Sequence, residues 1–324
     1  MALDKFDKQL LYELDHNARA TLNKLSKKVR LSKNSINLRI QKLEQKTIKQ
    51  AYTLIDVKSL GYEYFKVYFK LQNIDDEKEK EIIDYFSYQI QSLWVSSWDG
   101  SYDLMAGILA KSISEFYDVL QQAINKFKDN INSYDIFIVV SAPHFYRDYL
   151  STEKKLDFEE LSFGREKILL ELDEVDKKIL KTISTNARIS FVKLSQKTKL
   201  TFDVVRYRIK QLEKKGIIQG YRILPNYNEI QVNPYKILLN LQNLNTKTQN
   251  SIVAYARTIP QIVDIIVKGV GLWNAEIQID AKNHEEFHEI MREFKNKFNQ
   301  YIKDYKTLIL RKEHKLDYFP FKLE

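Results

Sequence analysis

Apolar residues near the start of the chain recur at the spacing of amphipathic helices. Phe6, Leu10 and Leu14 fall on one face of a first helix, and a second apolar stripe covers residues 22–29. After a short turn, Ser32 is a favourable N-cap for a third helix. Two short helices joined by a tight turn, the second of them basic, are typical of a helix-turn-helix.

Residues 48–55 then alternate as a strand, which would supply a wing, and the remainder of this half follows the order strand, helix, strand, strand, helix, strand. This order predicts a ferredoxin-like sandwich. Its six elements are expected at Glu63–Gln72, Glu77–Gln91, Leu93–Trp98, Tyr102–Ala110, Ser114–Lys126 and Ile131–Val140.

The whole arrangement occurs twice in the chain. Residues 4–52 align with residues 173–221 at a constant offset of 169, with 20 identities in 49 positions. Further along, the offset becomes 171, as a two-residue loop insertion would produce. In the second copy Thr201 caps the third helix and residues 217–224 form the wing strand. The later elements of this copy begin near Tyr235, Thr246, Ile262, Trp273, His284 and Tyr305.

We therefore expect an α+β protein in which two winged helix-turn-helix domains alternate with two ferredoxin-like (βαββαβ) sandwich domains. The strand that begins near Tyr235 carries apolar side chains on both faces, so self-association of the α/β domains through their sheets is expected, within one chain or between two. The expected bounds are 1–55 and 173–226 for the helix-turn-helix domains, 60–148 and 232–318 for the ferredoxin-like domains, and 149–172 for a partly helical connector.

The net charge of +9 is unevenly distributed along the 324 residues. Residues 1–50 hold 12 basic against 5 acidic residues and residues 173–222 hold 13 against 5, so the rest of the chain has a balance of −6. Positive charge confined to the two helix-turn-helix segments favours contact with the phosphates of double-stranded DNA. A solvated lysine-rich face would give the same counts and stays open at this point.

The composition argues against several other classes of site. Zero cysteines exclude disulfides and thiolate chemistry, and the only two histidines one helical turn apart, His284 and His288, fit a solvated helix face. We expect no metal site, no cofactor and no catalytic residues. No apolar run is long enough to cross a bilayer and the N-terminus lacks a signal-peptide pattern, so we expect a cytoplasmic protein without membrane contact.

Short motifs in both copies carry a family resemblance. In the first copy they are Asp4-Lys5-Phe6-Asp7, Asn17-Ala18-Arg19, Leu25-Ser26, Leu31-Ser32, Arg39-Ile40-x-x-Leu43-Glu44 and the loop Asp99–Leu104. The chain resembles the Lrp/AsnC family, the feast/famine regulators, as a tandem pair. The resemblance implies a DNA-binding winged helix-turn-helix, an α/β domain that dimerises through its sheet, and an amino acid bound at a subunit interface. Copy one departs from the family at Thr47, where copy two keeps the usual glycine as Gly216, which bears on how the third helix ends.

The side of the third helix away from the core would enter the major groove. The amides of Asn34 and Asn37 can read adenine, while Lys33 and Arg39 fit phosphate contacts. Arg39 and Arg208 could equally be surface salt-bridge partners. The two faces share little chemistry, so they should read different half-sites, or one copy only holds the backbone. The candidate DNA-binding residues are Lys33, Asn34, Ser35, Asn37, Arg39 and Gln41 in copy one and Phe202, Arg206, Tyr207, Arg208 and Lys210 in copy two.

The candidate ligand-binding residues are Gly100, Ser101, Tyr102 and Asp103. Backbone N–H groups of this loop could meet the carboxylate of an amino-acid effector, and Asp103 could meet its ammonium group. A plain hairpin turn with a solvated Asp103 is the alternative. Copy two has Asn274 at the equivalent place, so sensing is expected mainly in copy one.

These features together favour a sequence-specific DNA-binding transcription regulator that responds to an amino acid or related small molecule, not an enzyme. Two alternatives remain. Siroheme decarboxylases share this tandem plan, but their chemistry needs basic and histidine side chains around the sandwich, and the second and third predicted sandwich strands lack histidine in both copies. The other alternative is a sensing or assembly module that does not bind DNA.

Overall fold

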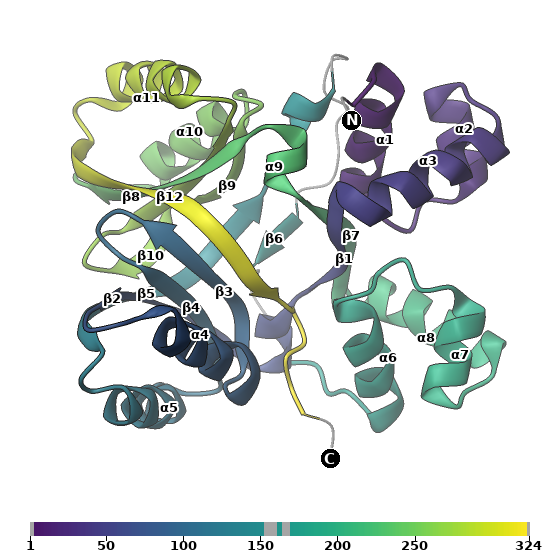
Figure 1. The fold of residues 1–324 in the computed structure, drawn as a ribbon, viewed down its shortest axis with the longest axis horizontal. Coiled ribbons are helices and arrows are strands. Elements are labelled where there is room, and N and C mark those ends of the chain that lie inside the picture. Colours follow the sequence, from purple (N-terminus) through teal and green to yellow (C-terminus); the bar gives the residue numbers. More distant parts are fainter. Residues whose placement is uncertain (1–2, 152–160, 164–168, 323–324) are drawn as a thin grey trace.

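The computed structural model describes residues 3–151, 161–163 and 169–322, and the remaining part of the predicted connector lies outside the described residues. The order of elements confirms the α+β fold with two helix-turn-helix units and two ferredoxin-like units. In Figure 1 the two helix-turn-helix units lie together on one side of the molecule and the two ferredoxin-like units lie on the other.

The helix-turn-helix elements begin at the predicted polar caps. They are α1 (Lys5–His16), α2 (Leu22–Val29), α3 (Lys33–Lys46) and β1 (Ile48–Ile55) in copy one, and α6 (Glu174–Ser184), α7 (Phe191–Thr198), α8 (Phe202–Lys214) and β7 (Ile218–Pro225) in copy two. The Ser32 hydroxyl accepts from Ser35 N at 3.2 Å and the Thr201 hydroxyl from Val204 N at 3.3 Å. These side chains satisfy amides that the first turn of α3 and of α8 leaves unpaired.

The two predicted wing strands pair with each other. β1 and β7 form a two-stranded antiparallel sheet, from Ile48 opposite Pro225 to Ile55 opposite Ile218. The alternation along the sequence predicts each strand as the wing of its own copy, whereas its partner is the corresponding strand of the other copy. The helix-turn-helix units are therefore joined by backbone hydrogen bonds as well as by side chains.

Both ferredoxin-like units have the predicted order of elements. Copy one contains β2 (Glu63–Leu71), α4 (Asp76–Asp84), β3 (Ser92–Asp99), β4 (Leu104–Ala110), α5 (Ile113–Lys126) and β5 (Ile131–His144). Copy two contains β8 (Asn233–Leu241), α10 (Thr246–Ala256), β9 (Ile262–Ile266), β11 (Ala275–Ala281), α11 (His284–Phe298) and β12 (Ile302–Leu316). Short additions are η1 (Val57–Leu60), η2 (Tyr85–Gln89), η3 (Asp148–Leu150), β6 (Leu161–Phe163), α9 (Tyr227–Ile230) and β10 (Lys268–Gly271).

The two units share one sheet that returns on itself. Its strands follow the order β10-β5-β2-β4-β3-β12-β8-β11-β9, and β5 also pairs with β9 at His144 opposite Asp264. The other junction is the antiparallel pairing of β3 with β12, from Asp99 opposite Ile309 to Trp94 opposite Leu316. The expected association of the α/β units through their sheets thus forms within a single chain.

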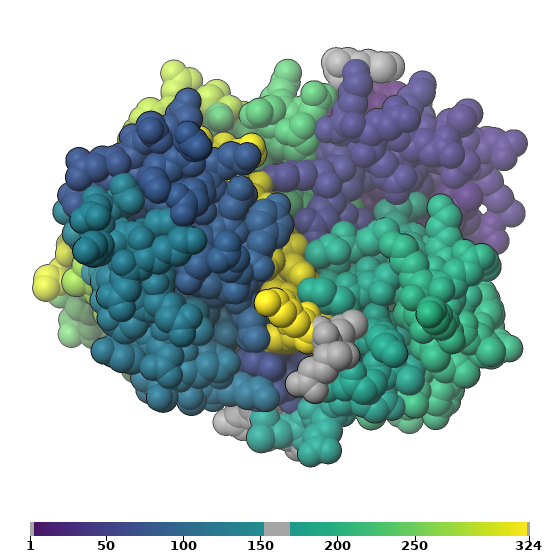
Figure 2. Space-filling model, turned by 60° about the horizontal axis from the view of Figure 1, so that its bottom comes forward, coloured from purple at the N-terminus to yellow at the C-terminus, as the bar shows by residue number. Residues whose placement is uncertain are grey.

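The buried apolar residues divide into three clusters. One cluster lies between the copy-one sheet and its helices, and a second, which contains Ile237 and Leu239, lies between the copy-two sheet and its helices. The third joins the helix-turn-helix cores to the inner faces of both sheets, where Tyr68, Trp273 and Leu238 are buried. Because this third cluster is continuous, the helix-turn-helix units pack as part of the sandwich rather than as separate bodies. Figure 2 shows the C-terminal segment, in yellow, between a ferredoxin-like unit and a helix-turn-helix unit.

Candidate nucleic-acid interface and buried charge network

The predicted DNA-binding residues lie on the outer faces of α3 and α8. The opposite face of α3 buries Ile36, Ile40 and Leu43 against α1 and α2, as their helical spacing predicts. On α8, Phe202 and Tyr207 leave 43% and 61% of their surface exposed, so this helix offers aromatic rings where α3 offers amides. Lys33, Asn34, Asn37, Gln41, Arg206 and Lys210 are exposed as well, whereas Ser35, Arg39 and Arg208 are half-buried.

Arg39 and Arg208 each bind two aspartates of their own unit. Arg39 Nη1 lies 2.8 Å from Asp4 Oδ2 and 2.6 Å from Asp7 Oδ1, both at the start of α1. Arg208 Nη1 has the equivalent partners at the start of α6, 2.6 Å from Asp173 and 3.4 Å from Asp176. The hydrogen bond to Asp7 raises the pKa of Arg39 above its usual value. Both arginines therefore fix the recognition helix against the first helix of its unit.

The Asn-Ala-Arg motif makes contacts between the two copies. Ala18 N donates to Tyr221 O of β7, and Ala187 N donates to Ala51 O of β1, each at 2.8 Å. The donors are equivalent residues of the two copies and the acceptors are one position out of register, so an approximate two-fold axis relates the two units. These contacts hold α3 and α8 at a set separation and orientation.

The candidate ligand loop is a tight turn held by its own neighbours. Gly100 has φ +132°, and a Cβ at this position would lie 2.9 Å from Thr307 O, so both the conformation and the space require glycine. The Asp103 carboxylate accepts from Lys70 Nζ at 2.9 Å and from Leu71 N at 2.7 Å. Tyr102 Oη donates to Asp135 at 2.6 Å, and Ser101 is exposed. The hairpin explains these contacts without a ligand.

Asn274 occupies the same position in copy two and also bonds to the backbone at the end of the first sandwich strand. Its Oδ1 accepts from Leu241 N at 2.8 Å and its Nδ2 donates to Leu241 O at 2.7 Å. Both copies thus use a short polar side chain to close the end of the first sandwich strand, and only the charge differs between Asp103 and Asn274.

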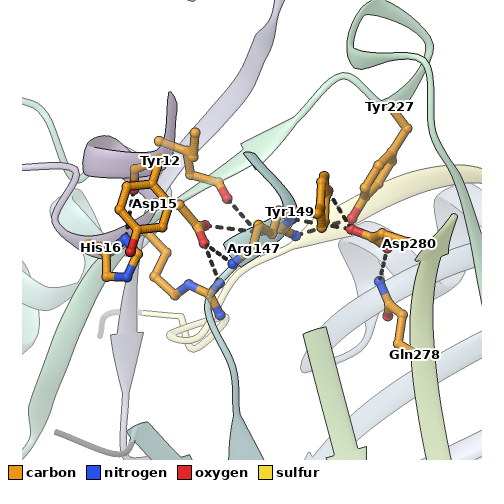
Figure 3. A network of polar contacts seen from close by, with 10 residues as sticks. Tyr12, Asp15, His16, Arg147, Tyr149, Tyr227, Gln278 and Asp280 are labelled. Atoms are coloured by element: carbon orange, nitrogen blue, oxygen red, sulfur yellow. Dashed lines mark hydrogen bonds and ion pairs between the residues drawn. The ribbon is translucent and has the colours of Figure 1, made fainter. Parts of the chain in front are cut away.

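A buried charge network lies between α1 and the sandwich (Figure 3). Asp15 of α1 is fully buried and accepts from Arg147 N at 2.9 Å, from Arg147 Nη1 at 2.8 Å and from Arg222 Nη2 of β7 at 2.7 Å. On its other side, Arg147 contacts Tyr227 Oη at 3.2 Å and lies 3.5 Å from the Asp280 carboxylate of β11. Tyr149 Oη donates to the same carboxylate at 2.8 Å.

The environment shifts the two acids of this network in opposite directions. Burial alone would raise the pKa of Asp15, but the charges of Arg222 and Arg147 outweigh it and hold the pKa below its usual value. Burial raises the pKa of Asp280, because the single arginine near it compensates only in part. The network therefore keeps Asp15 ionised as the partner of two arginines.

A second buried ion pair crosses between the two sheets. Lys66 of β2 lies 2.6 Å from Glu276 of β11, and Tyr68 Oη donates to the other oxygen of the same carboxylate at 2.7 Å. Trp273 Nε1 also donates to it, at 3.1 Å. These contacts link copy one to copy two in the interior of the sandwich.

Two other properties concern the described residues only. None of their helices is long and apolar enough to cross a membrane. Their His, Asp and Glu side chains form no group of three or more that could hold a metal ion. His284 and His288 contact each other through their Nε2 atoms at 2.8 Å on the exposed face of α11.

Both helix-turn-helix units match models of known protein families. A family model described as an AsnC-type helix-turn-helix domain matches residues 3–44, and one described as a winged helix-turn-helix DNA-binding domain matches residues 172–219. An HTH-type transcriptional regulator of Pyrococcus horikoshii is 31% identical over 121 residues, which are 37% of this chain and 80% of that protein. The chain belongs to the Lrp/AsnC family. The regulator LrpA of the same organism is 36% identical over 81 residues, which cover 24% of this chain and 52% of LrpA.

Among solved structures, the siroheme decarboxylase NirDL has the same tandem arrangement. It is 13% identical and superimposes with a TM-score of 0.62 over 97% of this chain and 94% of its own. At this identity the likeness concerns the fold. The shared fold extends over both halves of this chain.

The buried charge network of this Lrp/AsnC protein is not predicted by any motif in the sequence. Arg147 follows the last strand of copy one, outside any motif, and its partners Asp15 and Asp280 are far from it in the chain. One signal was available: at the offset of 169, Asp15 aligns with Ser184 and Arg222 with Thr53, so the charges occur on one side of the repeat only.

Proposed function

We propose that the protein is a sequence-specific DNA-binding transcription regulator whose recognition helices are α3 and α8. The observation that carries this proposal is the pair of exposed recognition faces fixed side by side through the Asn-Ala-Arg contacts. A pair of helix-turn-helix units related by a two-fold axis can enter two neighbouring major grooves. Family membership supports the same function.

The two helices should read different half-sites. On α3, Asn34 and Asn37 are exposed amides that suit adenine, and Lys33 suits a phosphate near the start of the helix. On α8, Arg206 and Lys210 suit guanine or phosphate, while the Tyr207 ring suits a thymine methyl group or the sugar. Ser35, Gln41 and Phe202 border these contacts. The operator would therefore be asymmetric.

Arg39 and Arg208 have a mixed role in this proposal. Their side chains are 27% and 33% exposed, so a phosphate could approach, but it would share each guanidinium with two aspartates. We assign them first to orienting the recognition helix and second to the DNA backbone.

The experiment that tests this function is selection of genomic DNA fragments by the purified protein, followed by titration of the selected fragment at several salt concentrations. We expect enrichment of one sequence and a linear fall of log K with log salt, with a slope of roughly −0.9 per neutralised phosphate. A protein that is not retained by DNA or heparin, or that enriches no sequence, would be a sensing or assembly module instead.

The response to an amino acid is a further part of the proposal, with Gly100, Ser101, Tyr102 and Asp103 as the loop that would hold it. A ligand ammonium group would have to replace Lys70 on Asp103, since this carboxylate is already bound. If so, Asp103→Ala removes the response and Asn274→Ala preserves it. Thermal stabilisation by a mixture of amino acids, measured for both variants, tests this assignment.

One observation favours a second candidate function. The fold of NirDL, named as a siroheme decarboxylase, matches along almost the full length of this chain. A tetrapyrrole substrate that carries carboxylate groups would need cationic side chains in the sandwich. The buried cations Lys66, Arg147 and Arg222 are there, but each already forms an ion pair with an acid of the protein. A Soret-type absorbance change on addition of an iron tetrapyrrole would favour the enzyme, and its absence together with DNA binding would favour the regulator.

A further inference from the structure

The C-terminal part of β12 has one unpaired edge. In the shared sheet β12 runs between β3 and β8, but these two neighbours pair with different parts of it. β8 pairs with β12 from Ile302 to Ile309, whereas β3 pairs with it from Ile309 to Leu316. Among the described strands none pairs with residues 311–316 on the side away from β3, and we call this stretch the open edge of β12. An unpaired strand edge is a template for a further strand.

The equivalent edge in copy one is filled by a strand. β6 pairs with β5 from Ala142 to His144, on the side opposite β9, because His144 pairs with both β6 and Asp264 of β9. At the offset of 171, residues 142–144 align with residues 313–315 of the open edge. β6 also contacts β7, so it lies between the sheet and the second wing strand (Figure 1). An edge of this kind therefore accepts a strand elsewhere in the same molecule.

On the open edge, side chains of the first wing strand take the place of a strand. Lys49 Nζ of β1 donates to Glu313 O, and Gln50 Nε2 donates to Leu316 O at 2.8 Å. Lys49 is exposed, and at the offset of 169 its counterpart in copy two is Ile218. A side-chain hydrogen bond at the surface contributes little net free energy, so an incoming backbone N–H can replace it.

The surroundings of the open edge are basic at its C-terminal end. A groove beside residues 314–317 is lined by the cations Lys181, Lys315 and Lys322 and by one acid, Asp317. The adjoining groove, beside residues 311–314, has basic and acidic residues in balance. Burial lowers the pKa of the Lys315 amine to about 8, and an anion beside it would offset this desolvation.

The occupant of the copy-one edge indicates what the open edge can accept. β6 is Leu161-Ser162-Phe163, an alternation of apolar and polar residues that suits an added strand with one face toward the protein. Where β5 has Ser141 and His144, the open edge has Lys312 and Lys315, so it favours a more acidic strand. Apolar side chains that could cover its inward face line the groove at Tyr88, Ile90, Leu316 and Phe321.

We propose that the open edge of β12 binds an extended acidic segment of a partner protein, which joins the sheet as an additional strand. The backbone of this segment replaces Lys49 on Glu313 O, and its carboxylates lie beside Lys315 and Lys322. The site contains none of the residues assigned to DNA contact, so a partner can dock while α3 and α8 remain available to DNA.

The probe for this site is a fluorescent peptide with the sequence of residues 156–163, LDFEELSF, which combines the β6 residues with three acids. We expect the full chain to bind it in anisotropy titrations. A peptide with Asp157→Asn, Glu159→Gln and Glu160→Gln should bind about tenfold more weakly, because it lacks the charges that the lysines attract. In hydrogen exchange, the bound acidic peptide should protect the amides of residues 311–316.

Charge reversal on the protein tests the same contact from the other side. Lys312→Glu and Lys322→Glu are exposed positions, so both variants should fold, and each should weaken peptide binding about tenfold. Lys303→Glu, at an exposed position near the other end of β12, is the matched control and should bind the peptide as the wild type does. Melting curves establish that each variant is folded.

Four results would overturn the proposal. The first is no binding at about 1 mM peptide, the range of a weak complex. The second is equal affinity for the acidic and the amide peptide, or for the Lys312→Glu, Lys322→Glu and Lys303→Glu proteins. The third is protection of residues 142–144 instead, because the peptide would then exchange with β6. The fourth is a dimer in sedimentation that hides residues 311–316 from exchange, which would assign the edge to a second copy. None of these results bears on DNA binding, which is measured separately.

Discussion

Arg19 and Arg188 hold the two helix-turn-helix units together by a reciprocal contact. Nη1 of Arg19 donates to Ala187 O, and Nη1 of Arg188 donates to Ala18 O, both at 2.6 Å. Each arginine thus binds the carbonyl just before the other, although the two are 169 positions apart. The Asn-Ala-Arg motif therefore acts together with the β1–β7 pairing to set the geometry of the two recognition helices.

Removing this contact should weaken DNA binding more than it weakens the fold. We expect each of Arg19→Ala and Arg188→Ala to lower the free energy of unfolding by about 1–3 kcal/mol, the usual cost of a lost charge-assisted hydrogen bond. The double variant should lose affinity for the selected DNA at 25 °C while still folded, because only backbone contacts such as the β1–β7 pairing then hold α3 and α8 at their spacing. Gel-shift titration beside denaturant unfolding measures both. Arg292→Ala, at an exposed position of α11, is the control.

Substitutions on the exposed face of α3 should distinguish residues that supply affinity for any DNA from residues that supply sequence specificity. Lys33→Ala should weaken binding to all sequences and reduce the salt slope by roughly 0.9, since one phosphate contact is lost. Asn34→Ala should cost about 1–3 kcal/mol on the selected site and little on random DNA. Lys303→Ala, an exposed lysine of β12, should change neither quantity. Identical effects of Lys33→Ala and Lys303→Ala would contradict the assignment of α3.

Asp15→Asn should be strongly destabilising at neutral pH. It leaves Arg147 and Arg222 buried without their shared anion, which costs about 3–5 kcal/mol. The pKa of Asp15 is lowered in the folded protein, so its contribution to stability is complete above the ordinary value of 3.8 and is lost as the pH falls through the folded pKa. The gap between wild type and variant should therefore narrow in acid. Asp118→Asn, an exposed position on α5, should show no such trend in urea unfolding.

Glu313 should make the protein less stable as the pH rises from 4.5 to 7. Burial raises the pKa of its carboxyl from 4.5 to about 7, so the folded protein binds a proton in this range that the unfolded chain has released. Glu313→Gln removes this dependence, and it should be more stable than the wild type at pH 8 by about 1 kcal/mol or more. Melting temperatures across this range, with Glu289→Gln on the exposed face of α11 for comparison, check the prediction. If the melting temperatures of the wild type and of Glu313→Gln changed with pH in the same way, the prediction would be wrong.

The repetition and the periodicity of the chain predicted most of the fold. Helical stripes such as Ile36, Ile40 and Leu43, and caps such as Ser32, are local signals, and the structure confirms them. The pairing of β1 with β7 was not predictable in the same way, because alternation identifies a strand but does not name its partner. The long predicted helix at 77–91 became α4 followed by the π-helical turn η2, a difference that apolar spacing does not resolve.

The interior sites were harder to predict than the exposed ones. Outward positions on α3 and α8 follow from helical geometry, so Asn34 and Tyr207 could be placed on the surface from the sequence. Asp15, Arg147 and Glu313 come together only through the closed sheet, and each by itself resembles an ordinary surface charge. Comparison of the two copies was the one sequence signal, since Asp15 and Glu313 align with the uncharged Ser184 and Ala142.

The central claim is that one chain reads two different half-sites with α3 and α8 held at a fixed separation. The most direct measurement is footprinting of the selected DNA, followed by binding to the same DNA with five base pairs inserted between the two protected segments. Because five base pairs turn the second half-site by about half a helical turn, we predict a loss of affinity of about a hundredfold or more. Equal affinity for the original and the lengthened DNA would contradict the account.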